Sequence, residues 1–131
     1  MSWVSAFAGF LVAHMVGDYL LQTDWQARHK RGGLSGDPVA FRALVSHVTT
    51  YTIAFVPALI WIGYQTDAVV AVIAGALIFI PHLIVDDGRL VRLYLARVKR
   101  ADGFDVGLAA SVDQSFHVLS LSLVAILVGV S

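Results

Sequence analysis

The sequence predicts an all-α, polytopic membrane protein whose four transmembrane helices form an up-down bundle, in a single domain over residues 1–131. First, hydrophobic residues make up 58% of the chain and charged residues 14%, against roughly 45–50% and about 25% in soluble domains. Second, the apolar residues gather in four stretches with short connections between them: 3–23, 41–63, 68–86 and 108–130. Each stretch is close to the ~20 residues that a helix needs to cross a bilayer. A soluble domain of this size has too little interior to bury so much apolar surface.

The first stretch is predicted to be a membrane helix and not a signal peptide, because it has neither a basic beginning nor a small-residue cleavage site. Charge then orients the four helices. The nine Lys and Arg residues lie in or beside the connections 24–40 and 87–107, whereas the connection Tyr64–Asp67 and both termini have none. Basic loops stay on the cytoplasmic side. We therefore expect both basic loops in the cytoplasm, both termini outside, and a multi-pass protein of the inner membrane.

Within the last loop, segment 88–100 alternates arginines with apolar residues. It predicts a short basic amphipathic helix at the inner membrane face, or alternatively a cytoplasmic extension of the third helix. In both cases its charges lie near anionic lipid headgroups, so membrane lipids are expected partners. The tendency of cytoplasmic loops to be basic already accounts for this run of charge. No nucleic-acid partner is therefore expected. Cysteine is absent, which excludes disulfides, thiolate ligands and a thiol nucleophile.

Histidine and aspartate recur inside the apolar stretches at a spacing of four residues, which places both side chains of a pair on one helix face. The pairs are His14 and Asp18, His82 and Asp86, and Asp113 and His117, with His47 alone in the second stretch. The order reverses in the fourth stretch, where the chain direction also reverses. The histidine is thus the deeper member of every pair, and we expect one polar layer roughly 8–15 Å below the cytoplasmic surface, at ~1.5 Å per residue.

Such a layer needs compensation. An aspartate near a helix centre costs about 2.5–3.5 kcal/mol, and the whole fold is stable by only ~5–15 kcal/mol. Seven His and Asp side chains suit one octahedral ion or two bridged ions, and their nitrogen and oxygen ligands are compatible with zinc, manganese or iron. The alternatives are a neutral hydrogen-bonded network, a proton-handling site and a haem site. Haem is disfavoured by the carboxylates beside the histidines.

Three more polar residues are expected to orient the ligands through hydrogen bonds. Gln22 follows Asp18 by four residues, Tyr51 follows His47 by four, and Gln114 adjoins Asp113. Asp87, which follows Asp86, is expected at the wet interface instead.

Three of these motifs and a histidine in the second stretch together resemble the bacterial membrane family called domain of unknown function 3307. The motifs are His14-Met-Val-Gly-Asp18-Tyr-Leu-Leu-Gln22-Thr-Asp24-Trp25, His82-Leu-Ile-Val-Asp86 and Asp113-Gln114-Ser-Phe-His117. The likeness covers nearly the whole chain and departs after Asp86, where Asp87-Gly88-Arg89 stands. It implies the same seven His and Asp residues as the functional ones, and no activity. The layout is also similar, more loosely, to small membrane proteins described as metal-dependent hydrolases.

The leading functional hypothesis is therefore a metal-dependent hydrolase acting on a lipid-linked or membrane-associated substrate. Asp18, Asp86 and Asp113 are its candidate catalytic residues, one of them as a general base. The alternatives are a transport component for a metal ion or protons, and a non-catalytic structural or interaction module. Transport is disfavoured because the outer halves of the helices have no ionisable residue. The sequence leaves a homo-oligomer open.

Overall fold

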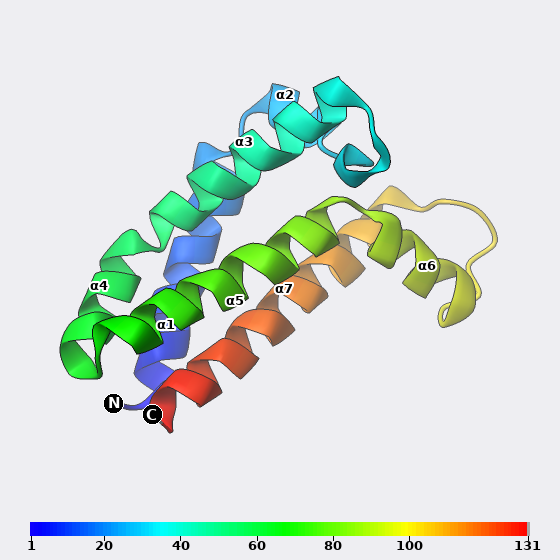
Figure 1. Ribbon diagram of the computed structural model, residues 1–131. Helices are drawn as coiled ribbons and strands as arrows, with labels where there is room; N and C mark the ends of the chain where they lie inside the picture. The colour runs from blue at the N-terminus through cyan, green and yellow to red at the C-terminus, as the bar shows by residue number, and fades with distance from the viewer. Residues whose placement is uncertain (131) are drawn as a thin grey trace.

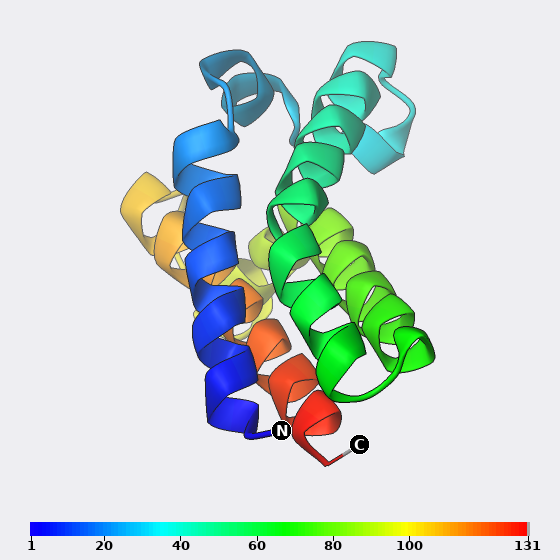
Figure 2. The same ribbon diagram turned by 90° about the vertical axis from the view of Figure 1, so that its left-hand side faces the viewer.

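The computed structural model describes residues 1–130, which are helical apart from short connections and contain no strand. The predicted all-α fold class is confirmed. Four rods of helix run alternately up and down, and the two termini lie together at one end (Figures 1 and 2). The other end carries the segments around α2 and α6.

The first rod consists of two kinds of helix. α1 (Trp3–Met15) begins at a Ser2 cap and continues directly into η1, a π-helix over Val16–Leu21. A π-helix has a wider turn than an α-helix and is commonly found at functional sites. Gly17 lies in this wider turn, where a Cβ atom would meet the Tyr51 ring at 2.6 Å. The glycine thus lets η1 approach the next rod closely.

Residues 24–40, predicted as a loop, contain two short helices. α2 (Asp24–His29) begins with a capping box between Thr23 and Gln26, and η2 (Gly33–Ser35) is a single 3₁₀ turn. Asp87 anchors this segment to the end of the third rod: its Oδ1 accepts from Leu34 N at 2.7 Å. Asp87 is therefore buried, and the expectation that it lies at the wet interface is wrong.

The second rod is bent where the sequence analysis expects one stretch, 41–63. α3 (Pro38–Ala54) and α4 (Val56–Gln65) meet at an angle of 46°. Pro57 explains the bend, because it has no N–H to donate to the carbonyl one turn back. Phe55 fills the inside of the bend, with its ring 4.8 Å from that of Tyr51 and 5.9 Å from that of Phe10.

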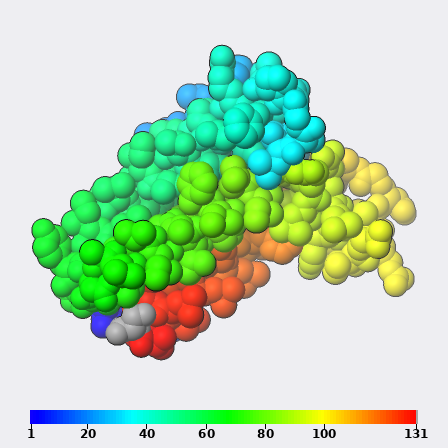
Figure 3. Space-filling model, viewed as in Figure 1, coloured from blue at the N-terminus to red at the C-terminus, as the bar shows by residue number. Residues whose placement is uncertain are grey.

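The remaining rods are α5 (Ala68–Asp86) and α7 (Val106–Gly129). Between them, Gly88 adopts a left-handed conformation, with φ of 82°, that ends the third rod and starts α6 (Arg89–Arg97). The segment is therefore a separate helix and not a continuation of α5. Figure 3 shows it projecting from the body of the bundle. Around the bundle, α1 packs on α7, α7 on α5, α5 on α3 and α4, and α3 on η1.

The outside of the bundle is apolar. Large hydrophobic side chains are exposed on each rod, among them Leu20, Val72 and Leu123. Three helical segments are long and apolar enough to cross a membrane: Trp3–Leu21, Ala68–Asp86 and Val106–Gly129. The bent pair α3 and α4 raises the number to four if it counts as one span.

Candidate metal centre

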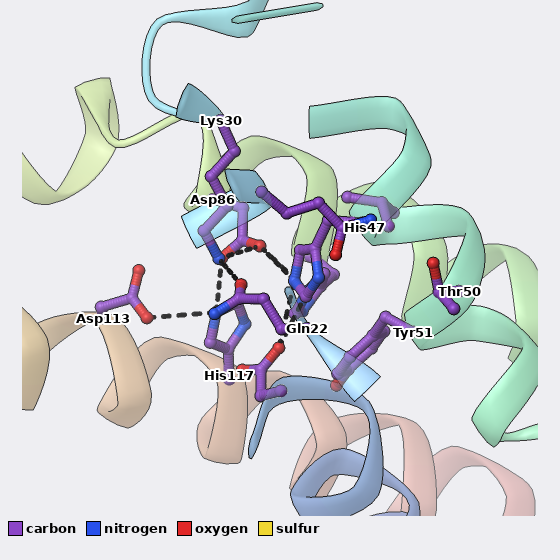
Figure 4. Close-up of polar contacts among 12 residues, drawn as sticks. Gln22, Lys30, His47, Thr50, Tyr51, Asp86, Asp113 and His117 are labelled. Carbon is purple, nitrogen blue, oxygen red and sulfur yellow. Dashed lines mark hydrogen bonds and ion pairs between the residues drawn. The ribbon is translucent and has the colours of Figure 1, made fainter. Parts of the chain in front are cut away.

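A buried layer of histidine and aspartate side chains lies toward the end of the bundle that carries α2 and α6. Each rod contributes to it: η1 provides Asp18, α3 provides His47, α5 provides His82 and Asp86, and α7 provides Asp113 and His117. In Figure 4 the side chains of His47, Asp86, Asp113 and His117 point toward one another from different helices. The structure therefore brings together residues up to about a hundred positions apart in the chain.

Four of these residues form the tightest group: Asp18, His47, His82 and Asp86. The Nε2 atoms of His47 and His82 lie 3.2 Å apart. Asp86 Oδ2 lies 2.9 Å from His47 Nε2 and 3.1 Å from His82 Nε2. Asp18 Oδ1 lies 3.2 Å and 3.5 Å from the same two nitrogens. All four residues are buried.

These spacings fit the ligands of one cation. Zinc bonds of about 2.0–2.2 Å place neighbouring tetrahedral ligands about 3.3–3.5 Å apart, and octahedral bonds of about 2.1 Å place them about 3.0 Å apart. The five distances range from 2.9 to 3.5 Å. Two imidazole nitrogens and two carboxylate oxygens are also ligands that zinc, manganese and iron accept. The four-residue group can therefore hold a divalent ion with little rearrangement.

Hydrogen bonds alone satisfy this group poorly. Two neutral imidazoles offer at most one Nε2 hydrogen each, yet five close contacts lie among the four atoms. Asp18 Oδ1 is buried without a hydrogen-bond partner among residues 1–130, and so are the Nδ1 atoms of His47 and His82. A buried carboxylate oxygen that accepts no hydrogen bond is costly, and a cation between the four atoms would offset that cost. It would also leave the protons on the two Nδ1 atoms, where no described side chain accepts them.

A second group shares Asp86 with the first and adds Asp113 and His117. His117 Nε2 lies 3.2 Å from Asp86 Oδ1 and 3.4 Å from Asp113 Oδ2. The two oxygens of Asp86 thus face different groups, which is the arrangement of a bridging carboxylate. The Asp113 side chain is 24% exposed, so this second group is open where the first is closed.

A chain of hydrogen bonds surrounds both groups. His14 Nδ1 lies 3.0 Å from the Tyr51 hydroxyl, and His14 Nε2 lies 2.9 Å from Gln114 Oε1. Because an amide oxygen only accepts, His14 must carry its hydrogen on Nε2, and Tyr51 donates to Nδ1. The Gln114 amide nitrogen then donates to Asp18 Oδ2 at 3.4 Å and to Asp113 Oδ2 at 3.3 Å. The chain fixes the outer oxygen of Asp18, leaves Asp18 Oδ1 directed at the histidines, and also bonds the Asp113 oxygen that faces His117.

Six of the seven sequence-predicted ligands therefore lie in one group or the other, and His14 lies beside them. Its two ring nitrogens are engaged by Tyr51 and Gln114, and its distance to Asp18 Oδ2 is 3.6 Å. Tyr51 also stacks on the His82 ring, with centroids 3.5 Å apart. Gln22 belongs to neither group, and its Oε1 accepts from Lys30 Nζ at 2.6 Å.

Lys30 is the residue at the centre that sequence reasoning missed. Its Nζ donates to Asp86 Oδ2 at 2.7 Å, and its side chain is only 13% exposed. Figure 4 shows it reaching the layer from the segment that follows α2. Lys30 looks like one more loop cation in the sequence, and no spacing rule connects it with Asp86, 56 residues away. The short helix α2 turns the chain back over the bundle and so brings it there.

A cleft of about 650 Å³ reaches this layer from the end of the bundle that carries α2 and α6. Its lining includes the candidate ligands Asp18, Asp86 and Asp113 and the neighbouring Gln114. It also includes the basic residues Lys30, Arg31 and Arg92. His47, His82 and His117 do not line it. The centre is therefore accessible through its carboxylates, while its imidazoles lie behind them.

A family model described as "Protein of unknown function (DUF3307)" matches residues 6–131. A search of the curated proteins and a search of the solved structures each found no match. The matched region contains the second, third and fourth rods, the first rod from residue 6 on, and every residue of the His and Asp layer. The chain therefore belongs to the DUF3307 family.

Proposed function

We propose that this chain is a multi-pass membrane protein that holds a divalent metal ion between its first three rods and uses it in hydrolysis. The convergence of Asp18, His47, His82 and Asp86 at ligand spacing carries the proposal. The exposed apolar side chains support four membrane crossings. The basic connections support the orientation in which the cleft opens to the cytoplasm and both termini lie outside.

The four-residue group is the proposed ion site, with zinc, manganese or iron as the candidate metals. When bound there, the ion supplies Lewis-acid chemistry: it activates water and polarises an acyl or phosphoryl oxygen. Lys30 stays beside Asp86 and holds part of its charge, and Gln114 orients Asp18. A ratio of two ions per chain would assign the group of Asp86, Asp113 and His117 to an ion as well.

Asp113 is the proposed general base. It is the most exposed of the three candidate catalytic carboxylates, it lines the cleft, and its Oδ2 is held by Gln114 and His117. In the proposed reaction water adds to the acyl or phosphoryl centre and the ester bond to the leaving oxygen breaks. Asp113 takes a proton from the water and then gives it to the leaving oxygen, so that the carboxylate is restored. Because the cleft lies at the end of the apolar rods, a lipid-linked or membrane-associated ester is the expected substrate.

Hydrolysis of chromogenic esters by detergent-purified protein tests this proposal. One phosphate ester and one carboxylate ester are assayed with protein that has been stripped with a chelator and reloaded with zinc, manganese or iron. We expect metal-dependent turnover of at least one ester and a loss of about 10²-fold or more in Asp113→Asn. Ser115→Ala is the matched control, because Ser115 is an exposed residue of the same helix whose hydroxyl donates to the Ser111 carbonyl one turn back. Turnover that survives both metal removal and Asp113→Asn would contradict the proposal.

A closed structural ion site is the second candidate, and one observation favours it. All four residues of the group are buried, and its two imidazoles do not line the cleft, as is typical of the ligands of structural ions. Retained metal without turnover of any ester, together with a lower melting temperature after metal removal, would assign this role instead.

A further inference from the structure

We propose that the cleft binds the phosphoryl group of a phosphate ester, and that Arg31 and Arg92 are the residues that hold its negative charge. The inference rests on the proposed metal centre, because it adds the ion's charge to the charges of the cleft. It names the substrate class and two specificity residues, neither of which is part of the His and Asp layer.

Arg31 and Arg92 differ from the other basic residues near the centre because they lack a carboxylate partner. Arg28 pairs with Asp24, Lys30 with Asp86, and Arg89 with Asp87. Within residues 1–130, neither Arg31 nor Arg92 has a carboxylate within ion-pair distance, and both line the cleft. Two arginines thus line one cavity without a carboxylate partner of their own.

Counting charges over the cleft predicts the ligand's charge. The lining contains three carboxylates and three basic side chains, which cancel: Asp18, Asp86 and Asp113 against Lys30, Arg31 and Arg92. One divalent ion in the four-residue group then leaves two positive charges. A phosphate monoester carries close to two negative charges near neutral pH, whereas a carboxylate carries one. The charge balance therefore favours a phosphoryl group over a carboxylate.

The two arginines are positioned by the same turn of the chain. The Arg31 side chain packs against Gly88, where an added Cβ would lie 3.5 Å from Arg31 Cγ. Its guanidinium lies 5.7 Å from the centre of the Phe104 ring, which further restrains it. Arg92 lies one turn into α6, where its N–H donates to the Gly88 carbonyl at 3.1 Å. The planar fork of each guanidinium can contact two phosphate oxygens.

The phosphoryl group can come from a lipid headgroup or from a soluble ester. The cleft wall includes Tyr19, and the neighbouring Leu20 is 76% exposed on the apolar outside of the first rod. An acyl or isoprenoid chain can therefore leave the cleft along that surface while the phosphate stays between the arginines. Both sources share the same phosphate chemistry, and the experiment separates them.

Calorimetric titration of metal-loaded protein in detergent tests the inference, with inorganic phosphate and short-chain phosphatidic acid as probes. We expect wild type to bind at least one probe, and Arg92→Gln and Arg31→Gln each to weaken that binding about tenfold or more. Arg97→Gln is the matched control, because Arg97 is an exposed arginine of the same helix that does not line the cleft. It should stay within about twofold of wild type. Tighter binding of phosphatidic acid than of phosphate identifies a lipid ester, and equal binding identifies a soluble one.

Metal content measured on the same samples separates the two proposals. Metal-loaded wild type that binds neither probe would refute the phosphoryl site and leave the metal centre standing. Equal weakening by Arg97→Gln and Arg92→Gln would refute it too, because the effect would then be one of general charge. Wild type that holds no metal would refute the metal centre and, with it, the charge balance on which this inference depends.

Discussion

On the first, third and fourth rods, one helix face is apolar near the end of the bundle where the chain termini lie. The same face is polar one helical turn closer to the end that carries α2 and α6. Phe10 precedes His14 by four residues, and Ile78 precedes His82 by four. On α7, which runs the other way, Leu121 follows His117 by four. Phe10, Ile78 and Leu121 belong to a buried apolar cluster, whereas the three histidines belong to the polar layer beside it.

The two layers satisfy different requirements. In the apolar layer, rings such as those of Phe10 and Phe55 only have to fill volume, and any well-packed set of hydrophobic side chains of similar size would do. In the polar layer, each atom needs a partner, and the hydrogens available there are too few for the contacts among Asp18, His47, His82 and Asp86. Packing therefore explains the apolar half of the bundle, whereas the polar half has a His and Asp group that could hold a metal ion.

The largest difference between the two layers is expected when Asp86, which both polar groups share, is mutated. Asp86→Ala should abolish metal binding and, in metal-free protein, cost about 3 kcal/mol of the free energy of unfolding, because Lys30, whose side chain is 13% exposed, would lose its carboxylate partner and keep only its hydrogen bond to Gln22. Metal analysis and unfolding in a denaturing detergent measure the two effects. Asp87→Ala is the neighbouring control: it removes another buried carboxylate, which bonds Leu34 N and Arg89, and it should keep the metal. Metal retained in Asp86→Ala would contradict the proposed site.

In the apolar layer the expected pattern is the reverse. Phe55→Ala should cost about 3–5 kcal/mol of the free energy of unfolding, because it leaves a cavity at the inside of the bend. Its metal content should stay at the wild-type level. Ile53→Ala, at a position 59% exposed on the same rod, should change stability by less than about 0.5 kcal/mol. Loss of metal in Phe55→Ala would show that the two layers are not separable.

A smaller change is expected where the layers meet. Gly17→Ala places a Cβ atom 2.6 Å from the Tyr51 ring, and such overpacking typically costs about 1–3 kcal/mol of stability. Tyr51 would also shift against His82, on which it stacks, so metal affinity should fall. Gly9→Ala on the same rod is the control, since its Cβ would meet only Ala58 at 3.8 Å. A Gly17→Ala protein as stable as Gly9→Ala would show that η1 and α3 can separate freely.

The smallest effect should come from the hydrogen bonds around the ligands. Gln114→Ala removes the donor to Asp18 Oδ2 and the acceptor of His14. Loss of such an orienting partner typically lowers metal affinity about 10–100-fold, which competition with a chelator measures. Ser111→Ala, at an exposed position one turn earlier whose hydroxyl donates to the Gly107 carbonyl, should leave the affinity unchanged. An unchanged affinity in Gln114→Ala would mean that the chain from Tyr51 to Gln114 does not orient Asp18.

Much of this arrangement could be predicted because helical periodicity is visible in the sequence. A spacing of four places His82 and Asp86 on one face, and the reversed order of Asp113 and His117 matches the reversed rod. The second-rod bend could have been anticipated from Pro57, but its angle depends on how Phe55 packs. The π-helix around Asp18 has no comparable local signal. Its wider turn explains why His14 bonds Tyr51 and Gln114 in preference to Asp18.

Contacts made by the connecting segments could not be predicted, because they depend on how the chain folds back over the bundle. Lys30 reaches Asp86 only because α2 turns the chain back, and Asp87 is buried only because Leu34 N lies against it. Neither contact follows a periodic spacing. Such residues are identified only from the contacts in the structure. Lys30 forms an ion pair with the buried carboxylate of Asp86, whereas Arg31 and Arg92 have no carboxylate partner among the described residues.

Metal content of the purified protein tests the central claim most directly, when wild type is compared with Asp18→Asn and with the double variant His47→Ala and His82→Ala. The four-residue group predicts at least one divalent ion per wild-type chain. It also predicts a fall to near zero in the double variant and a marked loss in Asp18→Asn, with all three proteins folded by circular dichroism. Wild type without stoichiometric metal, or a double variant that keeps the wild-type ratio, would contradict the claim that these four side chains meet around one ion.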